Sequence, residues 1–257
     1  KYGRAGGPVS RTPRAGTGWC PIESLAPWGE RSADAGDAVI PRTLHYCWFG
    51  DRSPDAAIER WMTTWSSVLP DYRVCRWDET NSPLEVDYCR HAHQQRRWSK
   101  LANYVRLWAL HNEGGVYLDT DVEVLRPFTP LLDAGVFLGF QRREEVPGWI
   151  NNAVLGAERG HPFLGECMEL TLSAFRERGE FMLSPHGTTQ VLRRRGLERY
   201  GPQRLGDIDV LALEAFYPYS WLESYAPQQV TEETFAVHHW KHSWKQGAPE
   251  PLFGGAA

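Results

Sequence analysis

The pattern of hydrophobic and polar residues along the chain predicts strands that alternate with helices. Short apolar or β-branched runs predict strands at residues 39–49, 72–77, 116–118, 136–140, 153–155, 208–211 and 235–239. Apolar residues at helical spacing predict helices at residues 54–69, 94–112, 162–178 and 188–195. Alternation of this kind predicts an α/β fold, in which helices cover the faces of a central sheet.

The clearest predicted helix, at residues 94–112, leads almost directly into the short strand at residues 116–118. One face of this helix is apolar, and Asn103 and Arg106 share another face three residues apart. Gly114 is a natural helix terminator. The short connection allows Asn103 and Arg106 to approach a ligand at the end of the strand. An ordinary surface arginine is the competing interpretation.

Two carboxylates, Asp119 and Asp121, close that strand one residue apart. Ligands of α/β sheets bind at the carboxyl ends of strands. A carboxylate pair there can hold one divalent cation, and the cation can hold and neutralise a diphosphate. An acidic turn is the competing interpretation. A phosphatase that begins with strand and Asp-x-Asp is disfavoured, because Glu123 stands where such an enzyme has threonine.

Three further side chains are candidates for substrate contacts. Trp48 ends the first predicted strand, where its ring can stack on a nucleobase or pack into the core. Asn151 and Asn152 precede a predicted strand, where their amides can bind sugar hydroxyls or form a turn. Residue type alone leaves both choices open.

The segment at residues 238–244 combines three histidines, one serine, one lysine and two tryptophans. If residues 235–239 form a strand, His238 and His239 face opposite sides, so at most one points at a given site. An imidazole or a hydroxyl can complete a metal shell built on aspartates. Lys241 can offset the charge of a diphosphate. A solvated aromatic plug is the alternative.

Composition predicts one globular domain at residues 39–246, between an irregular arm at residues 1–38 and a tail at residues 247–257. The net charge of −4 argues against broad nucleic-acid binding. The five cysteines are scattered without a C-x-x-C pair, which is typical of reduced thiols. Neither a signal peptide nor an apolar run near the ~20 residues of a membrane span is expected. The predicted location is cytoplasmic.

Residues 40–50, 65–72, 104–124 and 238–244 together resemble a known family in order and spacing. The chain is similar to the DXD-containing sugar transferases of glycosyltransferase family 32, including capsular-polysaccharide transferases. More distantly it is similar to the glucosyltransferase domains of large clostridial toxins. The resemblance implies a GT-A fold, a Rossmann-like α/β domain with a mixed central sheet and flanking helices.

The same resemblance implies a retaining glycosyl transfer that depends on Mn²⁺ or Mg²⁺. The donor would be a nucleotide diphosphate sugar, with a UDP-sugar favoured and a GDP-sugar as the alternative. The acceptor would carry a hydroxyl and could be a glycan, a lipid-linked glycan, a metabolite or a peptide. The competing activity is a metal-dependent hydrolase of sugar nucleotides or other phosphoesters. A non-catalytic sugar-nucleotide-binding module is a third interpretation, disfavoured by the retained Asp119, Asp121 and Arg106.

Roles of single residues follow from the resemblance by position. Trp48 matches an aromatic that stacks on the base, and Arg106 matches a helix arginine near the phosphates. Asp119 matches an aspartate near ribose, sugar and metal, and Asp121 matches the direct metal ligand. Trp244 matches a tryptophan that touches the β-phosphate or the leaving group.

The late metal ligand implied by the resemblance is His239 or Ser243. The sequence leaves open which of four side chains reaches the metal: His238, His239, His242 or Ser243. The family usually has Ser-Asp three residues before the helix arginine, where this chain has Ala102 and Asn103. Asn103 can still hydrogen-bond a ribose or sugar hydroxyl, but it carries no charge.

Overall fold

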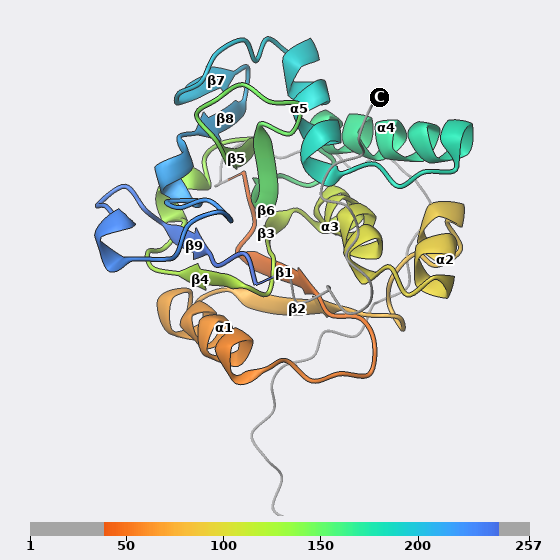
Figure 1. Ribbon diagram of the computed structural model, residues 1–257, viewed down its shortest axis with the longest axis horizontal. Coiled ribbons are helices and arrows are strands. Elements are labelled where there is room, and N and C mark those ends of the chain that lie inside the picture. The colour runs from red at the N-terminus through yellow and green to blue at the C-terminus, as the bar shows by residue number, and fades with distance from the viewer. Residues whose placement is uncertain (1–38, 242–257) are drawn as a thin grey trace, which may run out of the picture.

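The computed structural model describes residues 39–241, which are built around one seven-stranded mixed sheet (Figure 1). The strand order is β2-β1-β3-β6-β5-β8-β7, and a separate two-stranded sheet pairs β4 with β9. The strands are β1 Thr43–Cys47, β2 Arg73–Trp77, β3 Gly115–Leu118, β4 Val122–Val124, β5 Val136–Phe140, β6 Ile150–Ala157, β7 Gln203–Leu205, β8 Ile208–Leu211 and β9 Ala236–His238. The predicted α/β class with a mixed sheet is confirmed.

Five α-helices flank these strands within the described part of the chain (Figure 1). They are α1 Ala56–Val68, α2 Asp87–Gln94, α3 Trp98–Glu113, α4 Pro162–Arg178 and α5 Ser184–Arg194. Three short 3₁₀ turns complete the chain, at η1 Thr129–Leu131, η2 Leu213–Ala215 and η3 Pro227–Gln229. The predicted arm at residues 1–38 and tail at residues 247–257 lie outside the described residues, so the predicted domain boundaries stay predictions.

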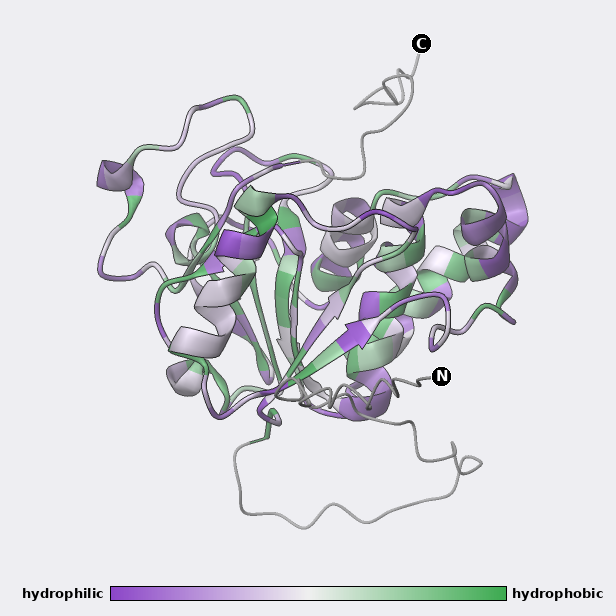
Figure 2. Ribbon diagram, turned by 90° about the horizontal axis from the view of Figure 1, so that it is seen from below, coloured by the Kyte–Doolittle hydropathy of each residue, from purple (hydrophilic) through white to green (hydrophobic). Residues whose placement is uncertain are grey.

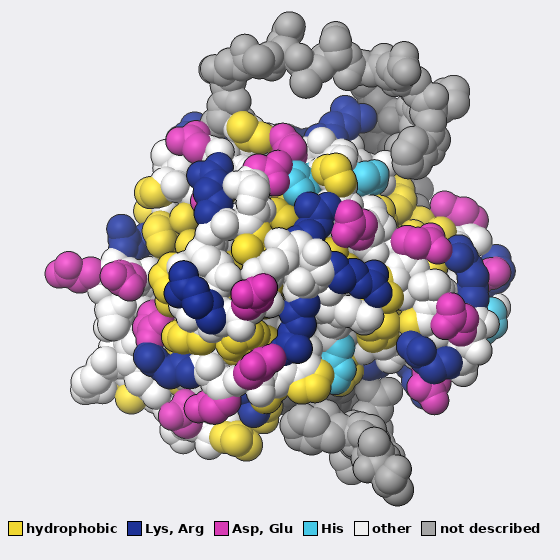
Figure 3. Space-filling view, turned by 90° about the horizontal axis from the view of Figure 1, so that it is seen from above, with side chains coloured by type: hydrophobic (Ala, Val, Ile, Leu, Met, Phe, Trp, Pro, Cys, Tyr) yellow, Lys and Arg dark blue, Asp and Glu magenta, His cyan; other side chains and the backbone are white. Residues whose placement is uncertain are grey.

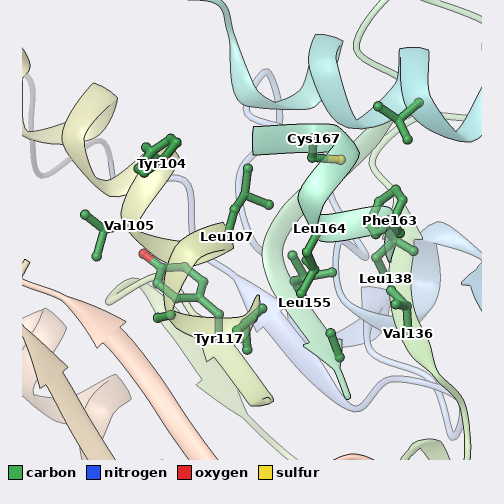
Figure 4. Packing of buried hydrophobic residues seen from close by; sticks show 14 of the residues in the cluster. Tyr104, Val105, Leu107, Tyr117, Val136, Leu138, Leu155, Phe163, Leu164 and Cys167 are labelled. Atoms are coloured by element: carbon green, nitrogen blue, oxygen red, sulfur yellow. The ribbon is translucent and has the colours of Figure 1, made fainter. Parts of the chain in front are cut away.

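Side chains that alternate along the strands supply two hydrophobic cores, one on each face of the sheet. On β3, Tyr117 packs into the core under α2–α5, while Val116 and Leu118 pack into the core beside α1 and β4. Figure 4 shows the first core, where Leu107 of α3 and Leu164 of α4 lie over the strands. In Figure 2 hydrophobic residues run along the interior strands, while the outer helix surfaces are more hydrophilic.

Helix α1 forms because its sequence has both a cap and an apolar stripe. The Asp55 carboxylate accepts hydrogen bonds from the backbone N–H groups of Ala57 and Ile58, both at 3.1 Å. Ile58, Trp61 and Trp65 recur at helical spacing and are buried. The Trp65 indole also donates to the Val122 carbonyl at 2.8 Å, which fixes α1 against the strand after the Asp pair.

The glycine pair before β3 is required by a close approach of two strands. Gly114 and Gly115 have φ values of +66° and +115°, which favour glycine. A Cβ on Gly115 would lie 2.4 Å from the Thr43 carbonyl oxygen of β1. β3 therefore runs parallel to β1 at short range, with Tyr117 beside His45. This pairing brings the carboxyl ends of β1 and β3 to one edge.

Several predicted elements differ from the observed ones. The predicted helix at residues 94–112 begins only at Trp98, because Arg96 has a φ of +54° and separates α3 from the unpredicted helix α2. The strand predicted at residues 153–155 is longer and starts at Ile150. The first strand is shorter than predicted, and β4 and β7, of three residues each, were not predicted. Strands so short carry too little periodicity to detect.

Candidate active site

Asp119, Asp121 and His238 form a cluster whose potential ligand atoms all lie within 4.8 Å of one another. The aspartates leave the carboxyl end of β3, and His238 arrives through the pairing of β9 with β4, in which Val122 lies opposite His238. His238 Nε2 lies 3.2 Å from Asp121 Oδ1. Three groups far apart in sequence thus face one point at the sheet edge.

His239 does not join this cluster, which corrects its prediction as the late metal ligand. Its Nε2 lies 2.8 Å from Glu123 Oε2, and its Nδ1 lies 3.2 Å from the Tyr219 hydroxyl. Its ring stacks on Trp61 at 4.3 Å with an interplanar angle of 9°. Neighbouring residues of a strand face opposite sides, so placing His238 beside Asp121 turns His239 away.

Arg106 lies beneath Asp119 and is 5% exposed. Its Nη2 is 3.0 Å from Asp119 Oδ1 and 3.4 Å from Asn103 Oδ1. Its Nη1 donates to the Asn152 carbonyl at 2.8 Å and to Asn152 Oδ1 at 3.3 Å, and its Nε donates to the Ala102 carbonyl at 3.3 Å. An arginine has five N–H donors. All three guanidinium nitrogens have protein acceptors, so this geometry positions Asp119, and the phosphate contact stays a prediction.

The charges of the cluster depend strongly on burial. Burial opposes ionisation of Asp121, but the His238 imidazole and the backbone N–H of Lys241 at 2.8 Å lower its pKa to about 2. Burial raises the pKa of Asp119, although Arg106 opposes this. The Tyr117 hydroxyl donates to Asp119 at 3.0 Å. Asp121 is therefore the more strongly ionised carboxylate of the pair.

Asn151 and Asn152 are buried inside β6, which corrects their prediction as sugar-binding amides. The Asn151 amide donates to Gln141 Oε1 at 2.8 Å, and its oxygen accepts from the Ala153 backbone at 2.8 Å. The Asn152 amide donates to the Ser184 hydroxyl at 2.5 Å, and its oxygen accepts from Arg106. Asn151 therefore joins β6 to the residue after β5, and Asn152 joins β6 to α5 and to Arg106.

The remaining predicted site residues have different outcomes. Lys241 places its ammonium 3.1 Å from Asp55 Oδ2, so its side chain pairs with the cap of α1 rather than with the aspartate pair. Trp48 lies just beyond β1, half-buried, and its indole donates to the Arg52 carbonyl at 2.6 Å. Asn103 accepts from Arg106. His242, Ser243 and Trp244 lie outside the described residues.

A cavity of about 460 Å³ opens beyond the carboxyl end of β1. Its walls come from the turn after β1, the residue pair after β2 and the junction of α2 with α3: Gly50, Asp51, Glu79, His93, Gln94, Arg96 and Trp98. The sequence did not predict these residues as a site, because α2 has no clear signal in the sequence. The Gly50-Asp51 turn and the Trp98 indole are the only signals in the sequence that mark the place.

A second carboxylate–histidine group lies at the opposite edge of the sheet: Glu158, His161 and Asp207. His161 Nδ1 accepts the backbone N–H of Phe163 at 3.2 Å and caps α4. A neutral imidazole then carries its proton on Nε2, which faces Asp207 Oδ2 at 3.2 Å. The proton occupies the position a metal would need, so this group is a structural pair.

Known proteins match two regions of the chain. Residues 55–138 match the "glycosyltransferase sugar-binding region containing DXD motif", and residues 156–250 match the "alpha 1,4-glycosyltransferase conserved region". Inositol phosphoceramide mannosyltransferase 3 of Schizosaccharomyces pombe is 31% identical over 135 residues, which cover 49% of this chain and 36% of that protein. Lactosylceramide 4-alpha-galactosyltransferase of Mus musculus is 30% identical over 175 residues, which cover 62% of this chain and 46% of that protein.

Among solved structures, the PaToxG glycosyltransferase superposes with a TM-score of 0.49 and 16% identity, covering 60% of this chain and 68% of that one. The two matched regions confirm the predicted resemblance: the chain is similar to the DXD-containing glycosyltransferases. Its mixed sheet with flanking helices is the arrangement that the resemblance to GT-A enzymes implies. The chain spans under half the length of the two curated relatives.

Two observations bear on partners and location. On the face shown in Figure 3, basic and acidic side chains are interspersed, without the continuous basic stripe typical of nucleic-acid-binding surfaces. Within residues 39–241, none of the helices has both the length and the apolar composition needed to cross a bilayer. The cytoplasmic location stays a prediction.

Proposed function

We propose that this chain transfers a sugar from a nucleotide diphosphate sugar to a hydroxyl-bearing acceptor, with a divalent cation held by Asp119, Asp121 and His238. The observation that carries the proposal is their convergence within 4.8 Å at the carboxyl end of β3. Such an edge is where α/β sheets bind nucleotides. The matched DXD region supports the same assignment.

The donor set fits a divalent cation. Two carboxylates and one imidazole suit Mn²⁺ better than Mg²⁺, which prefers oxygen ligands and its own waters. Asp121 is ionised, and His238 is held in place by ring contacts with Tyr217 and Trp240 at 5.8 and 4.2 Å. When bound, the cation neutralises the diphosphate and stabilises the charge of the departing nucleotide.

The residues around the cluster hold this geometry. Arg106 and the Tyr117 hydroxyl both bind Asp119 Oδ1, at 3.0 Å each, so the second oxygen of that carboxylate is left to face the cation. The Lys241 backbone N–H donates to Asp121 Oδ2, and His238 Nε2 lies 3.2 Å from Oδ1, so these two candidate ligands already face each other. Preorganised ligands of this kind cost little reorganisation during the reaction.

The nucleoside of the donor would occupy the cavity beside Gly50. β1 and β3 run parallel, with His45 beside Tyr117, so the turn after β1 and the aspartates after β3 leave the same end of the sheet. The β-phosphate of a nucleotide bound there would reach toward the aspartate pair.

Retention of anomeric configuration is part of the proposal and rests on the family resemblance. The acceptor would attack from the face that the leaving nucleotide vacates, so no protein nucleophile is needed. The names of the two relatives give a phosphoceramide and a lactosylceramide as their substrates. Those names favour a lipid-linked hydroxyl among the acceptor classes considered.

The test is nucleotide release from a panel of UDP- and GDP-sugars, with Mn²⁺ and with a chelator, for wild type and Asp121→Asn. We expect metal-dependent release from one donor, lost in the variant. Asp207→Asn is the matched control, because it changes the carboxylate of the other histidine pair and should keep full activity. Adding acceptor panels separates a transferase from a hydrolase, since free sugar as the sole product in every panel would favour the hydrolase.

A further inference from the structure

The cavity beyond β1 is lined by polar groups that can distinguish one nucleobase from another. Two of its lining side chains are carboxylates, Glu79 and Asp51, and a third is the Trp98 indole. Asp51 lies 3.5 Å from Arg96, so its charge is partly compensated there. Glu79 has no such cation: among residues 39–241, the only hydrogen bond of its side chain comes from the Gly50 backbone.

Glu79 is held in place by the turn after β1. The Gly50 N–H donates to Glu79 Oε1 at 2.6 Å. Gly50 has a φ of +82°, and a Cβ there would approach Trp98 Nε1 to 3.1 Å. The turn therefore packs directly on the indole and points its N–H at the carboxylate. This leaves Oε2, and one lone pair of Oε1, to accept hydrogen bonds from a ligand.

A carboxylate that is fixed in a cavity, with acceptor positions still open, favours a base that carries two hydrogen-bond donors side by side. Guanine has N1–H and the N2 amino group side by side, and these can make two parallel bonds to one carboxylate, as an arginine does. Its O6 needs a donor, which Gln94 and Arg96 supply from the same cavity. Uracil has one N–H between two carbonyl oxygens, so a carboxylate at that edge meets two acceptors.

We propose that the donor is a GDP-sugar, and that Glu79 reads the guanine base while the Trp98 indole forms an aromatic wall beside it. This rests on the proposed function, and it chooses between the two nucleotides left open by the sequence. In this proposal the base of the GDP-sugar lies beside the turn after β1, and its diphosphate lies at Asp119 and Asp121. Aromatic stacking is tolerant of base identity, so the carboxylate carries the selectivity.

The test is calorimetric binding of GDP, IDP and UDP to the whole chain in the presence of Mn²⁺. IDP is the informative ligand, since it is GDP without the N2 amino group. We expect GDP to bind about tenfold or more tightly than IDP, the effect of one hydrogen bond to a charged group, and UDP to bind more weakly than GDP. Glu79→Gln should weaken GDP about tenfold or more and remove the difference between GDP and IDP.

Glu85→Gln is the matched control, because Glu85 is exposed on the same connection and lies outside the cavity walls. Equal binding of GDP and IDP by wild type, or tighter binding of UDP, would overturn the inference and leave the proposed function standing. If no diphosphate binds in a metal-dependent way, the proposed function fails as well. The wild-type comparison decides the question even if Glu79→Gln does not fold.

Discussion

Replacing Arg106 should destabilise the protein far more than replacing a surface arginine. Its side chain is 6% exposed, its Nη2 lies 3.0 Å from Asp119 Oδ1, and its guanidinium also donates to Asn103, Asn152 and Ala102. Arg106→Met removes the cation and leaves Asp119, whose side chain is 27% exposed, with the Tyr117 hydroxyl but without its charged partner. Breaking one side of a fully buried pair costs about 3–5 kcal/mol, and the partial exposure of Asp119 places the cost expected here toward the lower end of that range. The total free energy of unfolding of a domain is only about 5–15 kcal/mol, so losing the Arg106–Asp119 pair would remove a large fraction of it.

Urea denaturation followed by circular dichroism measures the change in the free energy of unfolding. The matched control is Arg176→Met, because Arg176 pairs with Glu169 at 3.2 Å but both side chains are over 60% exposed. That surface pair should contribute about 0–1 kcal/mol. Equal destabilisation by the two variants would refute the assignment of Arg106 as a buried positioning residue.

A double-mutant cycle with Asp119→Asn isolates the pair itself. If most of the cost of Arg106→Met comes from the stranded carboxylate, the double variant should be less destabilised than the sum of the single changes. A coupling of roughly 1–3 kcal/mol is expected for groups in direct contact. Additive effects would show that Arg106 acts through its other acceptors. Arg106→Lys should recover only part of the loss, because lysine has three donors and no planar fork.

Three further predictions test other features. His238→Ala should abolish tight Mn²⁺ binding measured by titration calorimetry, while His239→Ala should keep it, because, of these two histidines, His238 is the one that faces the aspartates. Loss in the second variant alone would reverse the assignment. Gly115→Ala should destabilise the protein by more than about 2 kcal/mol, because its positive φ and a 2.4 Å contact with the Thr43 carbonyl both oppose a Cβ. The control Gly160→Ala, with a φ of +75° and open space around it, should cost about 1 kcal/mol in the same denaturation assay. Similar costs for the two variants would contradict the close approach of β3 to β1. Burial lowers the pKa of His45 from 6.5 to about 4. Between these values the unfolded chain binds more protons than the folded one, so stability falls as the pH is lowered through this range. The loss between pH 7 and pH 5 should be roughly 2 kcal/mol and absent in His45→Gln; an equal loss in the variant would exclude His45 as its source.

Local pattern was enough to predict most of the architecture. The helix at α4 and the strands at β5 and β8 were predicted with the observed bounds, because each has a clear period and clear boundaries in the sequence. The Asp pair was predicted at a strand end from its own neighbours. The mixed sheet was anticipated only through the resemblance, since the pairing of antiparallel β6 beside β3 has no local signature.

The site was harder to predict, because its geometry depends on contacts between distant segments. His238 reaches Asp121 through the pairing of β9 with β4, which joins residues more than a hundred positions apart. Nothing near His238 distinguishes it from His239 until that register is known. Asn151 and Asn152 were expected to be accessible, but the longer β6 buries both in hydrogen bonds.

By itself the sequence determined the class of fold, the carboxylate pair at a strand end and the kind of chemistry such a pair supports. These follow from periodicity and from residue types a few positions apart. Tertiary structure alone decided which histidine faces the aspartates, that Arg106 holds Asp119 from below, and that a carboxylate lines the cavity beyond β1. Each of these depends on strand register and on which polar groups burial forces to find partners, and both are properties of the packed chain.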